Sequence, residues 1–265
     1  MPILITLKVS LLAAALFFCQ ASFAHFQLVY TEQSIIPKPA NVPAKLIFWH
    51  PMSNGHAMDM LRPQDVAVIH RGKRTDLTSQ LSQTTFSGRH NQAVSWDVSV
   101  PIKRSGDYVL VVTPAPYYEE SEGIYIQQIT KTYLNRNQLP TDWQQVQNLK
   151  TEIRPLVKPY NVVVGTSFRG QILSEGKPVP FTEIEVEYLV AKPDMKTGAV
   201  GSDASIEMPG GAITIMSDAQ GVFSMAIPKA GSWGFAALGS GPDGSYQGKE
   251  LSQDAVIWIQ AHDIN

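Results

Sequence analysis

The sequence predicts an all-β protein made of two β-sandwich modules. Most of the chain alternates short runs rich in Val, Ile, Phe, Tyr and Trp with Gly, Pro, Asn, Asp and Ser, which is the pattern of strands joined by turns. No long stretch keeps the 3.6-residue period of an amphipathic helix. A chain of 265 residues is long enough for two ordinary domains.

Residues 1–24 have the composition of a secretion signal. A single charge, Lys8, precedes the apolar run Val9–Phe18, and small residues up to Ala24 suit a signal peptidase. The run is shorter than the roughly 20 apolar residues that a membrane span needs. We therefore expect cleavage after Ala24, a periplasmic mature chain that begins at His25, and no membrane span in that chain.

The first module is expected at residues 25–150. Gly72, between two basic residues, is typical of a hairpin turn. One helix is expected at Asp142–Lys150, after a capping residue. The clearest predicted strands are Lys45–Trp49, Val66–His70, Val94–Val98 and Tyr108–Thr113.

The second module is expected at residues 151–265. It follows a polar stretch and opens with Arg154–Pro159, whose prolines favour extended chain. Ala191–Gly211 contains several glycines and little periodicity, which indicates a long surface loop. The clearest segments of β pattern are Phe168–Leu173, Glu183–Leu189, Ser217–Phe223, Pro228–Phe235 and Ala255–Gln260.

Composition excludes several kinds of function and of site. The formal net charge of −2 gives no support for nucleic acid as a partner. The only cysteine, Cys19, lies in the expected signal, so the mature chain has neither disulfides nor thiolate ligands. No catalytic triad, phosphate-binding glycine loop or metalloprotease helix motif is present, so we do not expect an enzyme.

His25 is the first residue of the expected mature chain. Its free α-amine and its imidazole can chelate one divalent transition metal, and imidazole suits nickel, copper and zinc. Because the third mature residue is Gln27 and not His, the planar tripeptide chelate is not expected. The alternative is an incidental histidine at a frayed terminus.

A second group of donors begins at His50, which ends an apolar strand. A turn signal at Gly55 precedes His56. In an extended chain, His56, Met58 and Met60 would point to one face, and an imidazole with two thioethers suits a late transition metal. The alternative is that the methionines fill the core.

We expect these two groups to form one metal site, because only they offer imidazoles with supporting donors. Pro116–Glu122 carries three carboxylates and two phenols, and is expected to be a solvated acidic loop rather than a hard-cation site. The expected metal ligands are His25, His50, His56, Met58 and Met60.

Several blocks occur in a characteristic order along the mature chain. They are His25-Phe26, HPMSNGHAMDMLRP (50–63), GDYVLVVTPAPYYEESEGIYIQQITK (106–131), KTEIRPL (150–156), GQILSEGKPVPFTEIEVEY (170–188) and PKAGSWGFAAL (228–238). In these blocks the chain resembles a family of bacterial periplasmic proteins that is catalogued as a domain of unknown function. The family is described as the periplasmic component of cobalt/nickel uptake systems. The second half is also similar to transthyretin-like and immunoglobulin-like sandwich modules, which implies a scaffold.

The resemblance implies that the protein binds Ni(II) or Co(II) and delivers it to the membrane components of an uptake transporter. The family pattern has a His where this chain has Gln128, which implies a changed metal preference or affinity. One alternative is a Cu(II) protein, either a carrier or oxygenase-like, because copper outcompetes nickel for nitrogen donors. The other is a metal-free adhesion or assembly module.

Overall fold

The computed structural model describes residues 25–264, and their regular structure is almost entirely β. Within this range there is no α-helix, only one 3-10 turn, η1 (Thr78–Gln80). The predicted all-β class is therefore confirmed. The described residues also contain no helix with the length and hydropathy of a membrane span. The expected signal, residues 1–24, lies outside the described residues.

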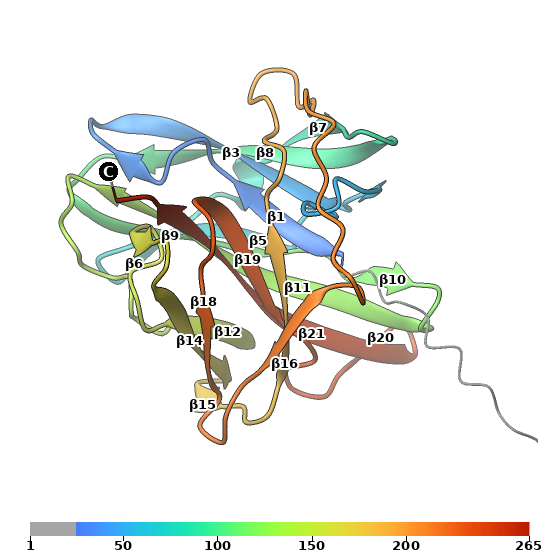
Figure 1. The fold of residues 1–265 in the computed structure, drawn as a ribbon. Helices are drawn as coiled ribbons and strands as arrows, with labels where there is room; N and C mark the ends of the chain where they lie inside the picture. The colour runs from blue at the N-terminus through green and yellow to red at the C-terminus, as the bar shows by residue number, and fades with distance from the viewer. Residues whose placement is uncertain (1–24, 265) are drawn as a thin grey trace, which may run out of the picture.

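A five-stranded antiparallel sheet forms one layer of the molecule (Figure 1). Its strands run in the order β1-β3-β8-β7, and β4 pairs with β3. These strands are β1 (Phe26–Tyr30), β3 (Ala40–Trp49), β8 (Gln92–Ile102), β7 (Ser82–Ser87) and β4 (Ala57–Met58).

A twelve-stranded mixed sheet runs through the rest of the molecule. Its main path, in order, is β17 (Ile213–Met216), β16 (Glu183–Tyr188), β19 (Gly231–Ala237), β21 (Lys249–His262), β11 (Ile124–Arg136), β9 (Gly106–Thr113), β5 (Asp65–His70) and β6 (Lys73–Asp76). The short strands β10 (Tyr117–Glu119) and β2 (Ile35–Ile36) pair with β11, and β13 (Val162–Val163) and β20 (Ser245–Tyr246) pair with β21.

Strands from both expected modules share this sheet. The parallel pair β11–β21 joins them, in a register from Tyr125 opposite Leu251 to Lys131 opposite Ile257. The boundary expected near residue 150 falls between β11 and β12. The division into two modules, 25–150 and 151–265, stays a prediction.

A four-stranded sheet packs against the part of the large sheet that contains β19. It consists of β12 (Thr151–Pro155), β14 (Ser167–Ser174), β15 (Lys177–Pro178) and β18 (Val222–Ala226). Phe168 and Phe223 from this sheet pack against Phe235 of β19, with ring centroids 5.0 and 5.6 Å from it. An aromatic core therefore joins the two sheets.

The apolar run Leu46–Trp49 packs the five-stranded sheet against its neighbours on both faces. Even-numbered residues of the run pack with β5, β9 and β11 in one apolar cluster. Odd-numbered residues pack in a second cluster with Trp258 of β21 and Ala236 of β19. Because side chains alternate along a strand, an unbroken apolar run is expected to be buried on both faces. His50 directly follows this strand.

The hairpin turn at Gly72 was predicted correctly, and the helix expected at Asp142–Lys150 was predicted wrongly. Gly72 has φ of 72° in the turn between β5 and β6, where a residue with a side chain would be strained. Asp142–Lys150 forms turns and irregular chain. Its amides are used elsewhere, because Asp142 donates to Asp107 Oδ2 at 2.9 Å, and Gln147 donates to Glu152 Oε1 at 2.9 Å.

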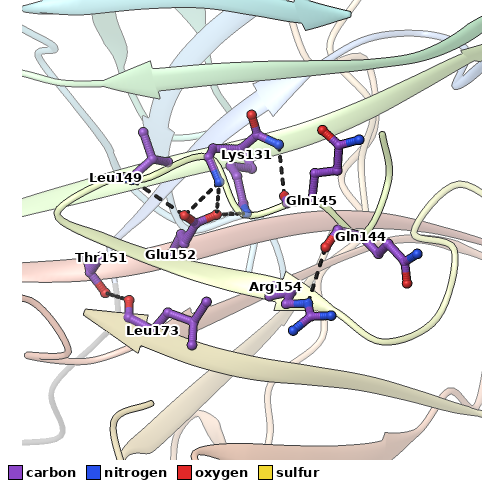
Figure 2. Close-up of polar contacts among 9 residues, drawn as sticks. Lys131, Gln144, Gln145, Leu149, Thr151, Glu152, Arg154 and Leu173 are labelled. Atoms are coloured by element: carbon purple, nitrogen blue, oxygen red, sulfur yellow. Dashed lines mark hydrogen bonds and ion pairs between the residues drawn. The ribbon is translucent and has the colours of Figure 1, made fainter. Parts of the chain in front are cut away.

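A fully buried ion pair joins β11 to β12. Lys131 Nζ lies 2.6 Å from Glu152 Oε2, and both side chains are completely inaccessible. Glu152 also accepts backbone hydrogen bonds from Gln147 and Leu149 (Figure 2). Burial by itself lowers the pKa of Lys131, but Tyr133 and Glu152 outweigh it and raise that pKa. Burial therefore does not remove the charge of Lys131, and Glu152 has its oxygens hydrogen-bonded.

We predict that Lys131→Met strongly destabilises the fold. The substitution leaves the Glu152 carboxylate buried without its countercharge, which costs on the order of 3 kcal/mol or more. Lys150→Met is the matched control, because Lys150 forms an exposed ion pair with Glu175 whose loss costs about 1 kcal/mol at most. Urea unfolding measures both, and equal losses would contradict the prediction.

Candidate functional site

Strand register brings two of the predicted ligands together. β1 and β3 are antiparallel, and their last pair is Phe26 opposite Trp49, so the next residues outward are His25 and His50. The two imidazole centroids lie 4.6 Å apart with their planes tilted by 44°. His50 is buried and His25 is half-buried. The sequence prediction named both histidines, and the register explains why they meet.

Two aromatic side chains surround His25. The rings of Phe48 and Tyr117 each lie 5.6 Å from the His25 ring, centroid to centroid. Phe48 and Tyr117 also contact each other at 5.1 Å. Burial lowers the pKa of His25 below its ordinary 6.5, against the opposing effect of Glu119. Burial therefore favours the neutral imidazole, which is the form that binds metals.

Glu119 adds a carboxylate to this pair. Its Oε2 lies 3.2 Å from His25 Nδ1, within ion-pair distance, but accepts no hydrogen bond from any described residue. Its Oε1 accepts hydrogen bonds from the amide and hydroxyl of Ser121. Burial raises the pKa of Glu119, but Ser121, His25 and His50 outweigh it and bring that pKa below its usual value. One oxygen is anchored, and the other faces the imidazole.

Glu119 and Tyr117 were missed as site residues by the sequence analysis. Both belong to β10, which pairs with the start of β11. The segment Pro116–Glu122 was singled out as an acidic loop, and its composition was the available signal. Its position beside His25 depends on long-range pairing that no local pattern reports.

Buried hydrogen bonds hold the strand that carries His25. The Gln27 amide donates to Gln128 Oε1 at 2.7 Å, and Trp258 Nε1 donates to the Gln27 carbonyl at 2.9 Å. Gln128 and Trp258 lie on β11 and β21, so the large sheet positions the start of β1. In this chain Gln128 therefore positions the backbone two residues beyond His25.

A tight turn holds His50 at the end of β3. The Gly55 amide donates to the His50 carbonyl at 3.0 Å, and Trp49 Nε1 donates to the Gly55 carbonyl at 2.9 Å. A Cβ at position 55 would lie 3.1 Å from the His50 Cβ, so a glycine fits the close approach. The preceding Asn54 has φ of 51°, which asparagine tolerates better than most residues.

The second half of the chain clamps this turn. The loop at 189–212, between β16 and β17, supplies the Ser202 and Ala204 carbonyls that accept from Asn54 Nδ2. On β16, Glu187 Oε2 accepts from the Met52 amide at 2.6 Å. The expected surface loop is thus largely exposed, but it also contacts the turn that presents His50.

The remaining predicted ligands have other environments. His56 is exposed, while Met58 and Met60 belong to the apolar cluster beneath β3. His56 therefore lies in a different environment from the two methionines, and β4 contains only two residues. Continuing the β3–β4 register would set His56 opposite His50. His56, Met58 and Met60 stay predictions as ligands.

The described side chains do not by themselves make a closed metal site. Among residues 25–264, no group of three or more His, Cys, Asp or Glu has the arrangement of one. What converges at the end of β1 is an imidazole pair and one carboxylate oxygen, beside aromatic rings. Nitrogen donors with one carboxylate suit a late transition metal if a further donor is supplied.

The clamp on the turn is predicted to make stability depend on pH. Burial, with a smaller effect of Glu185, raises the pKa of Glu187 to about 8 despite the opposing Met52 amide. Between the ordinary value of 4.5 and about 8, the folded state binds more protons than the unfolded state. Stability should therefore fall as pH rises through this window, by at most about 1.4 kcal/mol per pH unit for this group.

Glu187→Gln should flatten this slope and raise stability at pH 8, because the amide oxygen still accepts from Met52. Chemical unfolding at pH 5, 6.5 and 8 tests it. Glu207→Gln, at an exposed position in the loop at 189–212, is the control and should leave the slope unchanged. An unchanged slope in Glu187→Gln would show that the carboxyl does not carry the effect.

Likeness to solved structures is weak. A dimeric latent PorU from Porphyromonas gingivalis matches 89% of this chain at 10% identity and a TM-score of 0.22, and this chain covers 20% of that one. The D0-D1 domain of intimin matches 87% at 12% identity and a TM-score of 0.20, with 96% of its own length covered. The fibronectin(III)-like modules of CbhA from Clostridium thermocellum match 88% at 6% identity and a TM-score of 0.20, with 95% covered. TM-scores this low support no inference about function.

Sequence comparison identifies a family. No curated protein matches the chain. The domain of unknown function DUF4198 matches residues 22–241, which include β1, β3, β10 and the turn after His50. The match spans most of both expected modules and every side chain of the cluster at the end of β1. The chain therefore belongs to the DUF4198 family.

Proposed function

We propose that the mature chain binds a late transition metal, Ni(II) or Co(II), in the periplasm and passes it to a membrane uptake system. One observation carries the proposal. The His25 and His50 rings lie 4.6 Å apart, with Glu119 Oε2 3.2 Å from His25 Nδ1. Imidazoles with a nearby carboxylate are donors that nickel and cobalt accept.

The missing donor is the α-amine of His25. Cleavage after Ala24 would release this amine on the residue whose imidazole already lies beside His50. The site would then offer three nitrogen donors and one carboxylate oxygen. Formation of the complete site therefore depends on export and processing, which couples metal binding to the periplasm.

Burial and access both suit a carrier. His50 is largely inaccessible, while the His25 side chain keeps 21% of its surface exposed. A metal held there would be shielded on one side and reachable on the other. The resemblance to uptake components supports a membrane transporter as the partner that receives the metal.

Cu(II) is the competing cargo. The nitrogen-rich donor set, with two imidazoles and an amine, favours copper over nickel by the usual order of affinities. Selection of nickel or cobalt would then reflect which metal reaches the protein. Competitive titration of tag-free mature protein with nickel, cobalt, copper and zinc ranks the candidates directly.

We predict that the free N-terminus is required. Intact mass of the exported protein should correspond to a chain that starts at His25. A version with one extra Ala before His25 should bind nickel on the order of tenfold more weakly, because the amine no longer belongs to the histidine. Equal affinities would exclude the amine as a ligand.

We also predict that His50→Ala weakens nickel binding by on the order of tenfold or more. His262→Ala is the matched control, because that ring hydrogen-bonds the Tyr160 carbonyl in the other half of the chain. His56→Ala, measured in parallel by calorimetric titration, decides whether the exposed histidine is a ligand. Loss of binding in His262→Ala but not in His50→Ala would move the site elsewhere.

A further inference from the structure

We propose that the protein has a second binding site, for a small organic cation that carries a trimethylammonium group. The site is a cavity of about 280 Å³, called here the aromatic pocket, and it is small for a ligand pocket. None of His25, His50 and Glu119 is among the described residues that line it, so it is separate from the proposed metal site. The rings that define it are Phe48, Tyr117, Tyr118, Tyr125 and Tyr246.

Strand pairing gathers these rings from both halves of the chain. Tyr117 and Tyr118 lie on β10 and Tyr125 lies at the start of β11, which pairs with β10. Tyr246 lies on β20, which pairs with β21, and β21 in turn pairs with β11 (Figure 1). Phe48 comes from β3 of the five-stranded sheet. The pocket therefore exists only where the two sheets meet in the folded protein.

The rings of the aromatic pocket stand at steep angles to one another. The centroids of Phe48 and Tyr117 lie 5.1 Å apart, with the ring planes at 67°. The Tyr125 ring lies 4.9 Å from Tyr246 at 79°, and 5.1 Å from Tyr118 at 49°. Parallel ring faces hold a flat ligand, whereas walls set at angles fit a rounded one. Trimethylammonium is rounded, and aromatic cages are the usual means of binding it.

The charged side chains of the pocket favour a cation over an anion. Asp59 carries the only carboxylate among the described residues that line it, and none of these residues is lysine, arginine or histidine. Asp59 Oδ1 accepts from the Val94 amide at 2.7 Å, whereas Oδ2 accepts no hydrogen bond from the described residues. A cation in the pocket would meet this carboxylate and the negative faces of the rings, while an anion would be repelled by both.

One of the rings already holds a cation of the protein itself. Lys249 Nζ lies 4.5 Å from the centroid of the Tyr118 ring and donates to the Tyr118 hydroxyl at 2.7 Å. Lys249 is not among the described residues that line the pocket. Within residues 25–264, no lysine or arginine lies over any of the other four rings. An external cation would therefore meet ring faces that hold no other cation.

The test titrates metal-free, tag-free mature protein with choline, phosphocholine and 3,3-dimethyl-1-butanol, the uncharged carbon isostere of choline. Choline should bind about tenfold more tightly than the isostere, because the attraction of a desolvated cation to ring faces is of that size. Phosphocholine that binds as tightly as choline points to a lipid headgroup as the source of the group, and weaker binding points to a free solute. Either result supports a trimethylammonium site. Equal affinities for choline and the isostere, or no binding of choline, would overturn the inference.

Matched variants show whether the ring faces carry the binding. Tyr246→Leu keeps an apolar wall but removes the ring, so it should weaken choline binding about tenfold and leave that of the isostere unchanged. Tyr246→Phe should restore most of the lost affinity, and a loss as large as in Tyr246→Leu would contradict the role of the ring. Asp59→Asn keeps an acceptor for the Val94 amide and should weaken the binding of choline alone. Phe181→Ala, at a side chain that is 67% exposed and outside the pocket, is the control. Because no metal is present, failure here leaves the proposed function standing.

Discussion

The parallel pairing of β11 with β21 is the constraint on which the rest of the structure depends. It places the last strand of the chain in the middle of the large sheet, between β11 and β19. Parallel neighbours need a long connection, and here more than a hundred residues separate the two strands. The chain between them, which includes the four-stranded sheet and the loop at 189–212, therefore starts and ends at neighbouring strands of the large sheet.

Strand β11 also distributes contacts to its two sides. Gln128 reaches the backbone of β1, and Lys131 forms the buried pair with Glu152 of β12. Residues of opposite parity on a strand face opposite sides of the sheet. One strand therefore fixes both the position of β1 and the position of β12. Loss of the buried Lys131–Glu152 pair should therefore lower the stability of the whole fold.

The candidate site is a product of both halves of the chain, although its two histidines and its carboxylate come from the first. Trp258 donates a hydrogen bond to the Gln27 carbonyl, and Glu187 accepts one from the Met52 amide. A second half that acted only as a distant scaffold would touch none of these. In physical terms it positions the imidazole pair, because it supplies hydrogen-bond partners and packing to the strand and the turn that carry the two histidines.

The cluster at the end of β1 buries polar and ionisable groups, which costs folding free energy. Burial disfavours a charged His25, and Glu119 keeps a low pKa although one of its oxygens accepts no hydrogen bond from the described residues. Polar groups removed from water are normally paired, and exceptions concentrate at functional sites. In the proposed function, the metal would be a second partner for this oxygen beside the His25 imidazole.

The sequence by itself determined the all-β class and the Gly72 hairpin, and it named His25 and His50 as candidate ligands. Each of these depends on local chemistry: side-chain alternation, a residue that accepts positive φ, or the donor atoms of one residue. Only the tertiary structure decided that Asp142–Lys150 is not a helix, because distant carboxylates of Asp107 and Glu152 take its amides. It likewise decided that Met58 and Met60 are buried and that Glu119 faces His25. Those outcomes depend on strand pairings between residues far apart in sequence, and a pattern read over a few residues carries no information about them.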